Sequence, residues 1–248
     1  PGIACRSGSH NRGVTMRERA ADELRALRLH VGYTDATPGS VLIEMGRTRV
    51  LCTASIDTDM PRWMRDSGKG WVTAEYAMLP GSSSERIRRD AYTKGRQQEI
   101  SRLIGRALRS IISLDKMPNL TVRVDCDVIQ ADGGTRTAAV TGAWVAMHEA
   151  LEWALAQNLV VRNPIRDQVA ATSVGIVEGE ILLDLEYESD AAAQVDLNVV
   201  MSGEGGLVEV QGTAEGAPFD RAQLDEMLDL AAAGIRELVD AQIRATTP

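Results

Sequence analysis

The chain has 248 residues, of which 44% are hydrophobic and 25% are charged, the ordinary composition of a globular protein that can bury a substantial core. Its formal net charge of −8 excludes a protein that coats nucleic acid indiscriminately, so any contact with nucleic acid has to be local. The sequence contains no run of roughly 20 apolar residues and no apolar signal core near its start, so we expect a cytoplasmic protein with no membrane contact.

Residues 1–15 show no periodicity and are expected to be a disordered extension or a remnant of expression cloning, with Met16 as a candidate natural start. Residues 16–248 are predicted to form one domain. The three cysteines, Cys5, Cys52 and Cys126, have no paired spacing, so neither a disulfide framework nor a zinc site is expected.

The first half of the folded part is predicted to contain strands followed by helices. Its predicted elements are two strands within 40–56 joined by a turn at Gly46-Arg47, strands at 70–79 and 120–130, and helices at 97–114 and 137–157. The second half repeats this order, with strands at 168–177, 180–188, 195–201 and 207–212 and a long helix at 220–244. The pattern predicts an α+β fold with two pseudosymmetric halves, each made of strands and then helices.

A basic segment stands out in this acidic chain. Between Arg86 and Arg109 there are eight basic residues and two acidic ones. The first part of the segment has no apolar period and is expected to be an exposed, mobile loop. In the second part Arg102, Arg106 and Arg109 share one helix face, which is ordinarily a solvated face. Arg96 lies at the junction of loop and helix, where a helix N-terminus favours an anion.

The segment Ala131-Asp132-Gly133-Gly134-Thr135-Arg136-Thr137 joins a predicted strand to a predicted helix. Glycines allow the backbone to approach a ligand closely, the helix N-terminus favours an anion, and Arg136 can bind two oxygens through its guanidinium group. The sequence therefore predicts a phosphate site here, to which Arg96 would contribute. A tight turn with an N-cap threonine is the alternative.

Carboxylates gather in the second half of the chain. Asp184, Glu186, Glu188 and Asp190 alternate along the predicted strand 180–188 and just beyond it, and Asp196 follows Asp190 by six residues. If the chain turns back between them, Asp190 and Asp196 can hold a divalent cation, usually Mg²⁺ when phosphate supplies the other ligands. An acidic strand face exposed to water is the alternative. The three histidines, His10, His30 and His148, stand beside no evident nucleophile, which argues against Ser-His or Cys-His catalysis.

Several of these segments together resemble the ribonuclease PH family. The resemblance runs from about Asp22 to Ile243, and the matching segments are GWVTAEYAMLP (70–80), GRQQEISRLIGRALR (95–109), VDCDVIQADGGTRTAAVTGA (124–143), DLEYESDAAAQVDLNVVM (184–201) and VEVQGTAEGAPF (208–219). It implies the ribosomal protein S5 domain 2-like fold. It also implies a phosphorolytic 3′→5′ exoribonuclease, a nucleotidyltransferase that trims tRNA precursors and assembles as a homohexamer, a trimer of dimers.

The resemblance assigns roles to individual residues. Arg96 and the segment Gly134-Thr135-Arg136 would bind inorganic phosphate, the co-substrate. Asp190 and Asp196 would be catalytic and would hold Mg²⁺. Arg86 and Arg89 would hold the RNA.

The chain departs from the family pattern near the basic loop. The loop before Arg96 is about three residues shorter than usual, Lys94-Gly95 replaces a glycine pair, and Gly81 stands where an arginine is usual. These changes leave the expected phosphate site intact and bear on the docking of tRNA. Two rival functions remain open, a ring subunit of an exosome-like assembly that binds RNA without cutting it, and a metal-dependent hydrolytic nuclease.

Overall fold

The computed structural model describes residues 17, 19–88 and 95–247. The first half forms a five-stranded sheet of β1 (Leu27–Val31), β2 (Gly39–Met45), β3 (Thr48–Asp57), β4 (Trp71–Met78) and β5 (Thr121–Gln130). Its strand order is β1-β2-β3-β5-β4. Strands β4 and β5 are parallel, and the other neighbours are antiparallel. Helices α1 (Gly95–Ser110) and α2 (Thr135–Ala156) pack on this sheet.

The second half forms a four-stranded antiparallel sheet with the order β7-β6-β8-β9. Its strands are β6 (Val169–Val177), β7 (Glu180–Leu183), β8 (Val195–Ser202) and β9 (Leu207–Ala214). A short helix, α3 (Tyr187–Ala192), lies between β7 and β8, and the long helix α4 (Arg221–Thr246) follows β9. Asp220 and Gln223 form a capping box that fixes where α4 begins.

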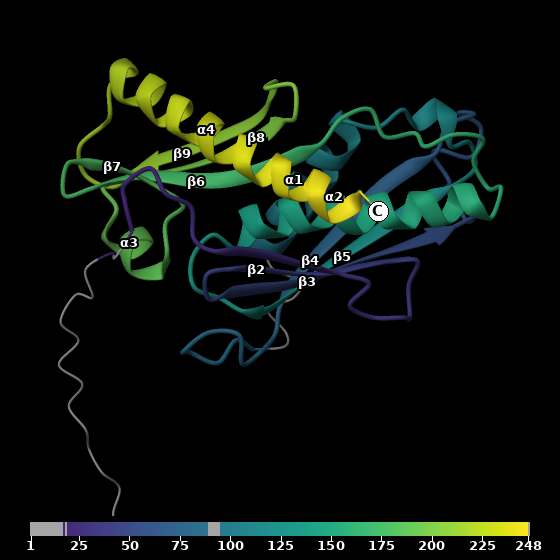
Figure 1. The fold of residues 1–248 in the computed structure, drawn as a ribbon, viewed down its shortest axis with the longest axis horizontal. Helices are drawn as coiled ribbons and strands as arrows, with labels where there is room; N and C mark the ends of the chain where they lie inside the picture. Colours follow the sequence, from purple (N-terminus) through teal and green to yellow (C-terminus); the bar gives the residue numbers. More distant parts are fainter. Residues whose placement is uncertain (1–16, 18, 89–94, 248) are drawn as a thin grey trace, which may run out of the picture.

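Helix α2 joins the two halves. It contacts both β3 of the first sheet and β6 of the second, and in Figure 1 the α2 ribbon lies between the two sheets. Small residues allow this close packing: a Cβ atom on Gly142 would lie 2.8 Å from Cγ2 of Ile43 and 2.9 Å from Sγ of Cys52. The buried apolar residues form one cluster that draws on both sheets and on α1, α2 and α4. The N-terminus of α2 is thereby held beside both sheets.

Most of the expected elements are present with small shifts at their ends. The strands β2 to β6, β8 and β9 and the helices α1, α2 and α4 were expected, whereas β1 and α3 were not. Cys52 on β3 and Cys126 on β5 are both buried free thiols. Within the described part of the chain, no helix is both long and apolar enough to span a membrane.

The predicted strand 180–188 is wrong in its second part. Strand β7 ends at Leu183, Asp184 adopts a left-handed conformation with φ of 54°, and α3 begins at Tyr187. The alternating carboxylates therefore do not share one strand face. A buried ion pair between Asp184 and Arg25 holds the chain in this turn.

Candidate active site

One pocket of about 680 Å³ brings the predicted site residues together. It lies where the end of β5, the starts of α1 and α2, helix α3 and strand β8 meet. The lining residues expected from the sequence are Arg96, Gly134, Thr135, Arg136, Asp190 and Asp196. They come from four separate elements and a turn, so their meeting is a product of the tertiary fold.

The turn before α2 has a backbone shape that glycine permits. Gly133 and Gly134 have φ angles of 72° and 61°, in the left-handed region that residues with a Cβ atom seldom adopt. A Cβ atom on Gly133 would also lie 2.5 Å from the carbonyl oxygen of Leu185. The hydroxyl of Thr48 donates to the Gly133 carbonyl at 2.7 Å, and the Arg25 guanidinium donates to the Asp132 carbonyl at 2.6 Å. The turn is thus held from two sides.

The N-terminus of α2 is open toward the pocket. The N-cap residue is Gly134, which offers no side-chain oxygen to the first N–H groups of the helix. The alternative of an N-cap threonine is therefore wrong, because Thr135 is already the first helical residue. Free N–H groups and the helix dipole favour an anion at this end.

Arg136 is held in place by two side chains from other elements. Its Nη1 donates to Oε1 of Gln211 on β9 at 2.7 Å, and it lies 3.7 Å from Oε1 of Glu99 on α1. Gln211 in turn donates to Glu99 at 2.9 Å. A guanidinium restrained in this way loses less rotational freedom when it binds an anion.

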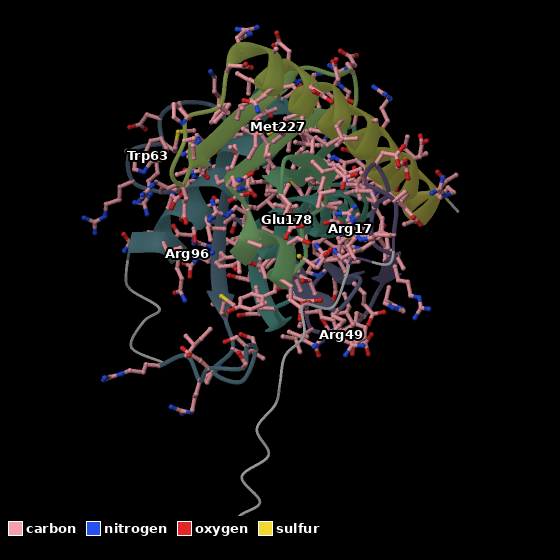
Figure 2. All side chains as sticks on the ribbon, turned by 90° about the vertical axis from the view of Figure 1, so that its left-hand side faces the viewer. Arg17, Arg49, Trp63, Arg96, Glu178 and Met227 are labelled. Carbon is pink, nitrogen blue, oxygen red and sulfur yellow. The ribbon has the colours of Figure 1, made fainter. Side chains whose placement is uncertain are left out.

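Arg96 is the second residue of α1 and lines the pocket from that helix. Figure 2 shows it well apart from Arg17 and Arg49. Together with Arg136 and Arg47 it supplies positive charge to a pocket whose lining also includes the four carboxylates of Asp132, Glu188, Asp190 and Asp196. Arg96, Arg136 and the α2 N-terminus form an arrangement that can bind a tetrahedral oxyanion.

Asp190 and Asp196 line the same pocket from α3 and β8. Loss of hydration raises the pKa of Asp190, although the charges of Arg96 and Arg136 act in the opposite direction. Loss of hydration also raises the pKa of Asp196, and the neighbouring negative charge of Asp190 adds to that rise. Asn198, on the same face of β8, places its amide 3.3 Å from the Asp196 carboxylate. Two neighbouring carboxylates with raised proton affinity are suited to share a cation.

A buried ion pair connects the turn before α2 (residues 132–134, called the phosphate turn below) to the segment that carries Asp190. Arg25 and Asp184 form a two-point contact, with Nε to Oδ2 at 2.9 Å and Nη2 to Oδ1 at 2.6 Å. Their side chains are only 6% and 1% exposed. Arg19 contacts Glu186, the residue before α3, and the carbonyl of Asp184. Arg19 and Arg25 therefore fix both sides of the pocket.

Of the two arginines expected to hold RNA, one lies beside this pocket and the other lies outside the described residues. Arg86 is exposed in the loop that follows β4; it is not itself part of the pocket lining, but Ser84 and Ile87 of the same loop are. Arg89 and the rest of 89–94 lie outside the described residues. The arginines of α1 are only partly a solvated face: Arg106 pairs with Glu209, and Arg109 lies over the ring of Trp71 at 4.5 Å.

Several residues of the site were not identified from the sequence. Arg25 contacts the carbonyl of Asp132, Tyr76 contacts Thr135 and Gln211 contacts Arg136, each from 59 or more positions away along the chain. No local pattern marks them. Asn198 is different, because its position two residues after Asp196 on a strand places both side chains on one face.

The chain is similar to known exoribonucleases over most of its length. Residues 23–151 match the sequence family described as "3′ exoribonuclease family, domain 1", and residues 167–234 match domain 2 of that family. Ribonuclease PH of Brucella ovis is 52% identical over 229 residues, which cover 91% of this chain and 96% of that protein. Ribonuclease PH of Corynebacterium efficiens is 54% identical over 227 residues, covering 90% and 93% of the two chains.

Solved structures share the fold at lower sequence identity. A chain of the Archaeoglobus fulgidus exosome with RNA bound to the active site superposes with a TM-score of 0.77 at 21% identity, with 90% of each chain covered. Rice (Oryza sativa) Rrp46 superposes with a TM-score of 0.75 at 18% identity, covering 93% of this chain and 99% of that one. At these sequence identities, the structural similarities are evidence for the fold alone.

Proposed function

The chain belongs to the ribonuclease PH family and is a phosphorolytic 3′→5′ exoribonuclease. We propose that the enzyme uses this pocket to trim 3′ extensions of tRNA precursors. The observation that carries the proposal is the meeting of Arg96, Arg136 and the open α2 N-terminus with Asp190 and Asp196 in one pocket. An anion-binding site beside two carboxylates can accommodate both reactants, inorganic phosphate and the terminal phosphodiester of RNA.

The reaction needs orientation and charge neutralisation more than a general base. Phosphate is already an anionic nucleophile at neutral pH, so Arg96, Arg136 and the backbone N–H groups of α2 have to hold it in line with the scissile phosphodiester. Phosphate attacks the phosphorus atom, the bond to the 3′-oxygen of the preceding nucleotide breaks, and a nucleoside diphosphate leaves. We assign Asp196 the further role of helping to protonate the departing 3′-oxygen.

Asp190 and Asp196 fit Mg²⁺ as its protein ligands. They offer hard oxygen donors in one pocket, and their mutual repulsion would be relieved by a cation. In the described part of the chain, no three His, Cys, Asp or Glu side chains gather into a metal cluster, so phosphate oxygens and water would complete the coordination. When bound, Mg²⁺ would offset the negative charge that builds on the scissile phosphate.

Two other functions make different demands on this pocket. A hydrolytic nuclease uses water as its nucleophile, so it does not need a second oxyanion-binding site beside the scissile phosphate. A ring subunit that only binds RNA has no need of Arg96, Arg136, Asp190 and Asp196 in one place. The chain retains all four, which favours phosphorolysis over both alternatives.

The test is incubation with a 3′-extended tRNA and Mg²⁺, with and without inorganic phosphate, followed by mass identification of the released nucleotides. We expect nucleoside diphosphates that appear only with phosphate. Nucleoside monophosphates released without phosphate would mean hydrolysis, and RNA binding without any release would indicate a non-catalytic subunit.

We also propose that the protein works in the cytoplasm as a homohexamer, a trimer of dimers. Large apolar side chains on the protomer surface, among them Trp63 at 66% and Val161 at 97% exposure, are consistent with surfaces that subunits cover. Light scattering is expected to give six times the protomer mass. A stable monomer of 26.8 kDa would contradict the ring.

A further inference from the structure

Tyr76 makes a contact in the pocket that has no part in the phosphorolysis steps proposed for Arg96, Arg136 and Asp196. The residue lies on β4, is 5% exposed, and donates its backbone N–H to Oγ of Ser101 at 2.9 Å, which fixes the strand against α1. Its phenol oxygen lies 2.8 Å from Oγ1 of Thr135, the first residue of α2. A buried phenol therefore contacts a hydroxyl at the proposed phosphate site.

The direction of this hydrogen bond follows from the chemistry of the two hydroxyls. Either oxygen can donate, but a phenol is much more acidic than an alcohol, so it is the better donor and the threonine oxygen is the better acceptor. Burial raises the pKa of Tyr76, so the phenol stays protonated at neutral pH and keeps its hydrogen available. With Tyr76 as donor, the Thr135 hydroxyl retains its own hydrogen for a different acceptor.

The surroundings of Thr135 indicate what that acceptor is. Within the residues that the structure describes, Tyr76 is the one hydrogen-bond partner of the Thr135 side chain. The neighbouring groups are the uncapped N-terminus of α2 and the Arg136 guanidinium, both of which favour an anion. An oxygen of a bound anion is the acceptor that all three groups can share.

We propose that Tyr76 is a positioning residue for phosphate: its hydrogen bond fixes the Thr135 hydroxyl so that this hydroxyl donates to the attacking phosphate. The inference rests on the proposed function, because it requires that Thr135 binds phosphate. It assigns Tyr76 no contact with the reacting atoms, so its effect passes through Thr135.

A double-mutant cycle tests this dependence. The variants are Tyr76→Phe, Thr135→Val and the two combined, with phosphorolysis measured at saturating RNA over a range of phosphate concentrations. We expect Tyr76→Phe to raise the phosphate KM by about three- to tenfold, the usual effect of removing one hydrogen bond, with kcat nearly unchanged. In the Thr135→Val background, Tyr76→Phe should have no further effect.

Two further variants separate positioning from general structural support. Thr135→Ser keeps the hydroxyl, so Tyr76→Phe should still raise the phosphate KM in that background. Tyr33→Phe is the matched control, because Tyr33 is exposed, lies outside the pocket and should leave the phosphate KM unchanged. Thermal stabilisation by phosphate alone, which needs no turnover, should weaken in Tyr76→Phe in parallel with the KM.

The outcomes distinguish this inference from the function on which it rests. If Thr135→Val leaves the phosphate KM unchanged, the role of Thr135 in phosphate binding fails and the inference fails with it. If Thr135→Val raises the KM but Tyr76→Phe does not, or if the two effects simply add, Thr135 keeps its role and the inference about Tyr76 alone is overturned.

Discussion

Catalysis is expected to depend on the carboxyl group of Asp196, which is proposed both to hold Mg²⁺ and to help protonate the departing 3′-oxygen. Asp196→Asn keeps the size of the side chain but removes the charge, so we expect turnover to fall by about 10²–10³-fold, the usual effect of removing one preorganised electrostatic interaction. RNA binding should be largely retained. The measurement is kcat for phosphorolysis together with the Kd for RNA.

Asp240→Asn is the matched control for this change, since Asp240 is exposed on α4 and lies outside the pocket. It should leave kcat at the wild-type value. Turnover near that of the wild type in Asp196→Asn would remove Asp196 from the reaction.

Arg136 is expected to act on phosphate itself. Its guanidinium is restrained by Gln211 and Glu99, so it is ready to bind an oxyanion with little loss of rotational freedom. Arg136→Ala should therefore raise the phosphate KM strongly while RNA binding changes little. Arg106→Ala is the control, because the ion pair of Arg106 with Glu209 is partly exposed and outside the pocket. An unchanged phosphate KM in Arg136→Ala would contradict the assignment.

At the scale of elements, the buried pair of Arg25 and Asp184 determines how the two sides of the pocket meet. Arg25 donates both to Asp184, which follows the end of β7, and to the carbonyl of Asp132 in the phosphate turn. Removing one member of a buried ion pair leaves an uncompensated charge and commonly costs about 3–5 kcal/mol. We expect Asp184→Asn to lower the free energy of unfolding at pH 7 by about that amount.

The contribution of Asp184 to stability should depend on pH. Burial alone would raise its pKa, but the hydrogen bonds and charge of Arg25 outweigh burial and leave the pKa below its usual value. Because the folded-state pKa is lowered, the stabilisation is complete above the usual Asp pKa of about 3.9 and is lost as the pH falls toward the lowered value. The difference between wild type and Asp184→Asn in urea unfolding should therefore be smaller at pH 3 than at pH 7.

The exposed pair of Arg221 and Asp225 on α4 provides the control for this experiment. Asp225→Asn should leave the free energy of unfolding nearly unchanged at both pH values. An equal loss at pH 3 and pH 7 in Asp184→Asn would show that the carboxylate charge is not the source of the stability.

The pair of Arg25 and Asp184 also explains why the sequence predicted one part of the site and not another. Local spacing was sufficient for the Gly133-Gly134 turn and for α2, because glycine conformation and helical periodicity are properties of neighbouring residues. It failed for α3, where alternating carboxylates have the pattern of a strand. There, contacts with Arg19 and Arg25, more than 150 positions away, override that pattern. The contact of Tyr76 with Thr135 likewise depends on how β4 and α2 meet in the fold.

At the scale of the whole molecule, the distribution of charge over the chain matters more for RNA binding than the net charge does. The net charge is −8, yet the segment from Arg86 to Arg109 contains eight basic residues and two acidic ones. A short basic segment in an acidic protein can attract RNA locally, whereas the rest of the surface repels it. The chain contains one Phe, four Trp and four Tyr, so few aromatic side chains are present to form a platform on which RNA bases could stack. Recognition of the RNA backbone should therefore dominate binding.

Binding through the RNA backbone predicts a steep dependence of affinity on salt. Removing one side chain that binds an RNA phosphate should reduce the slope of log K against log salt concentration by roughly 0.7 for single-stranded RNA. Arg86 is exposed in the loop after β4, so Arg86→Ala should flatten the slope by about that amount and weaken binding of all RNA sequences alike. Arg221→Ala, on the first residue of α4, should leave the slope unchanged. If the slope is as steep in Arg86→Ala as in the wild type, the RNA phosphates are held by other residues, and Arg86 is not part of the path that the RNA follows to the pocket.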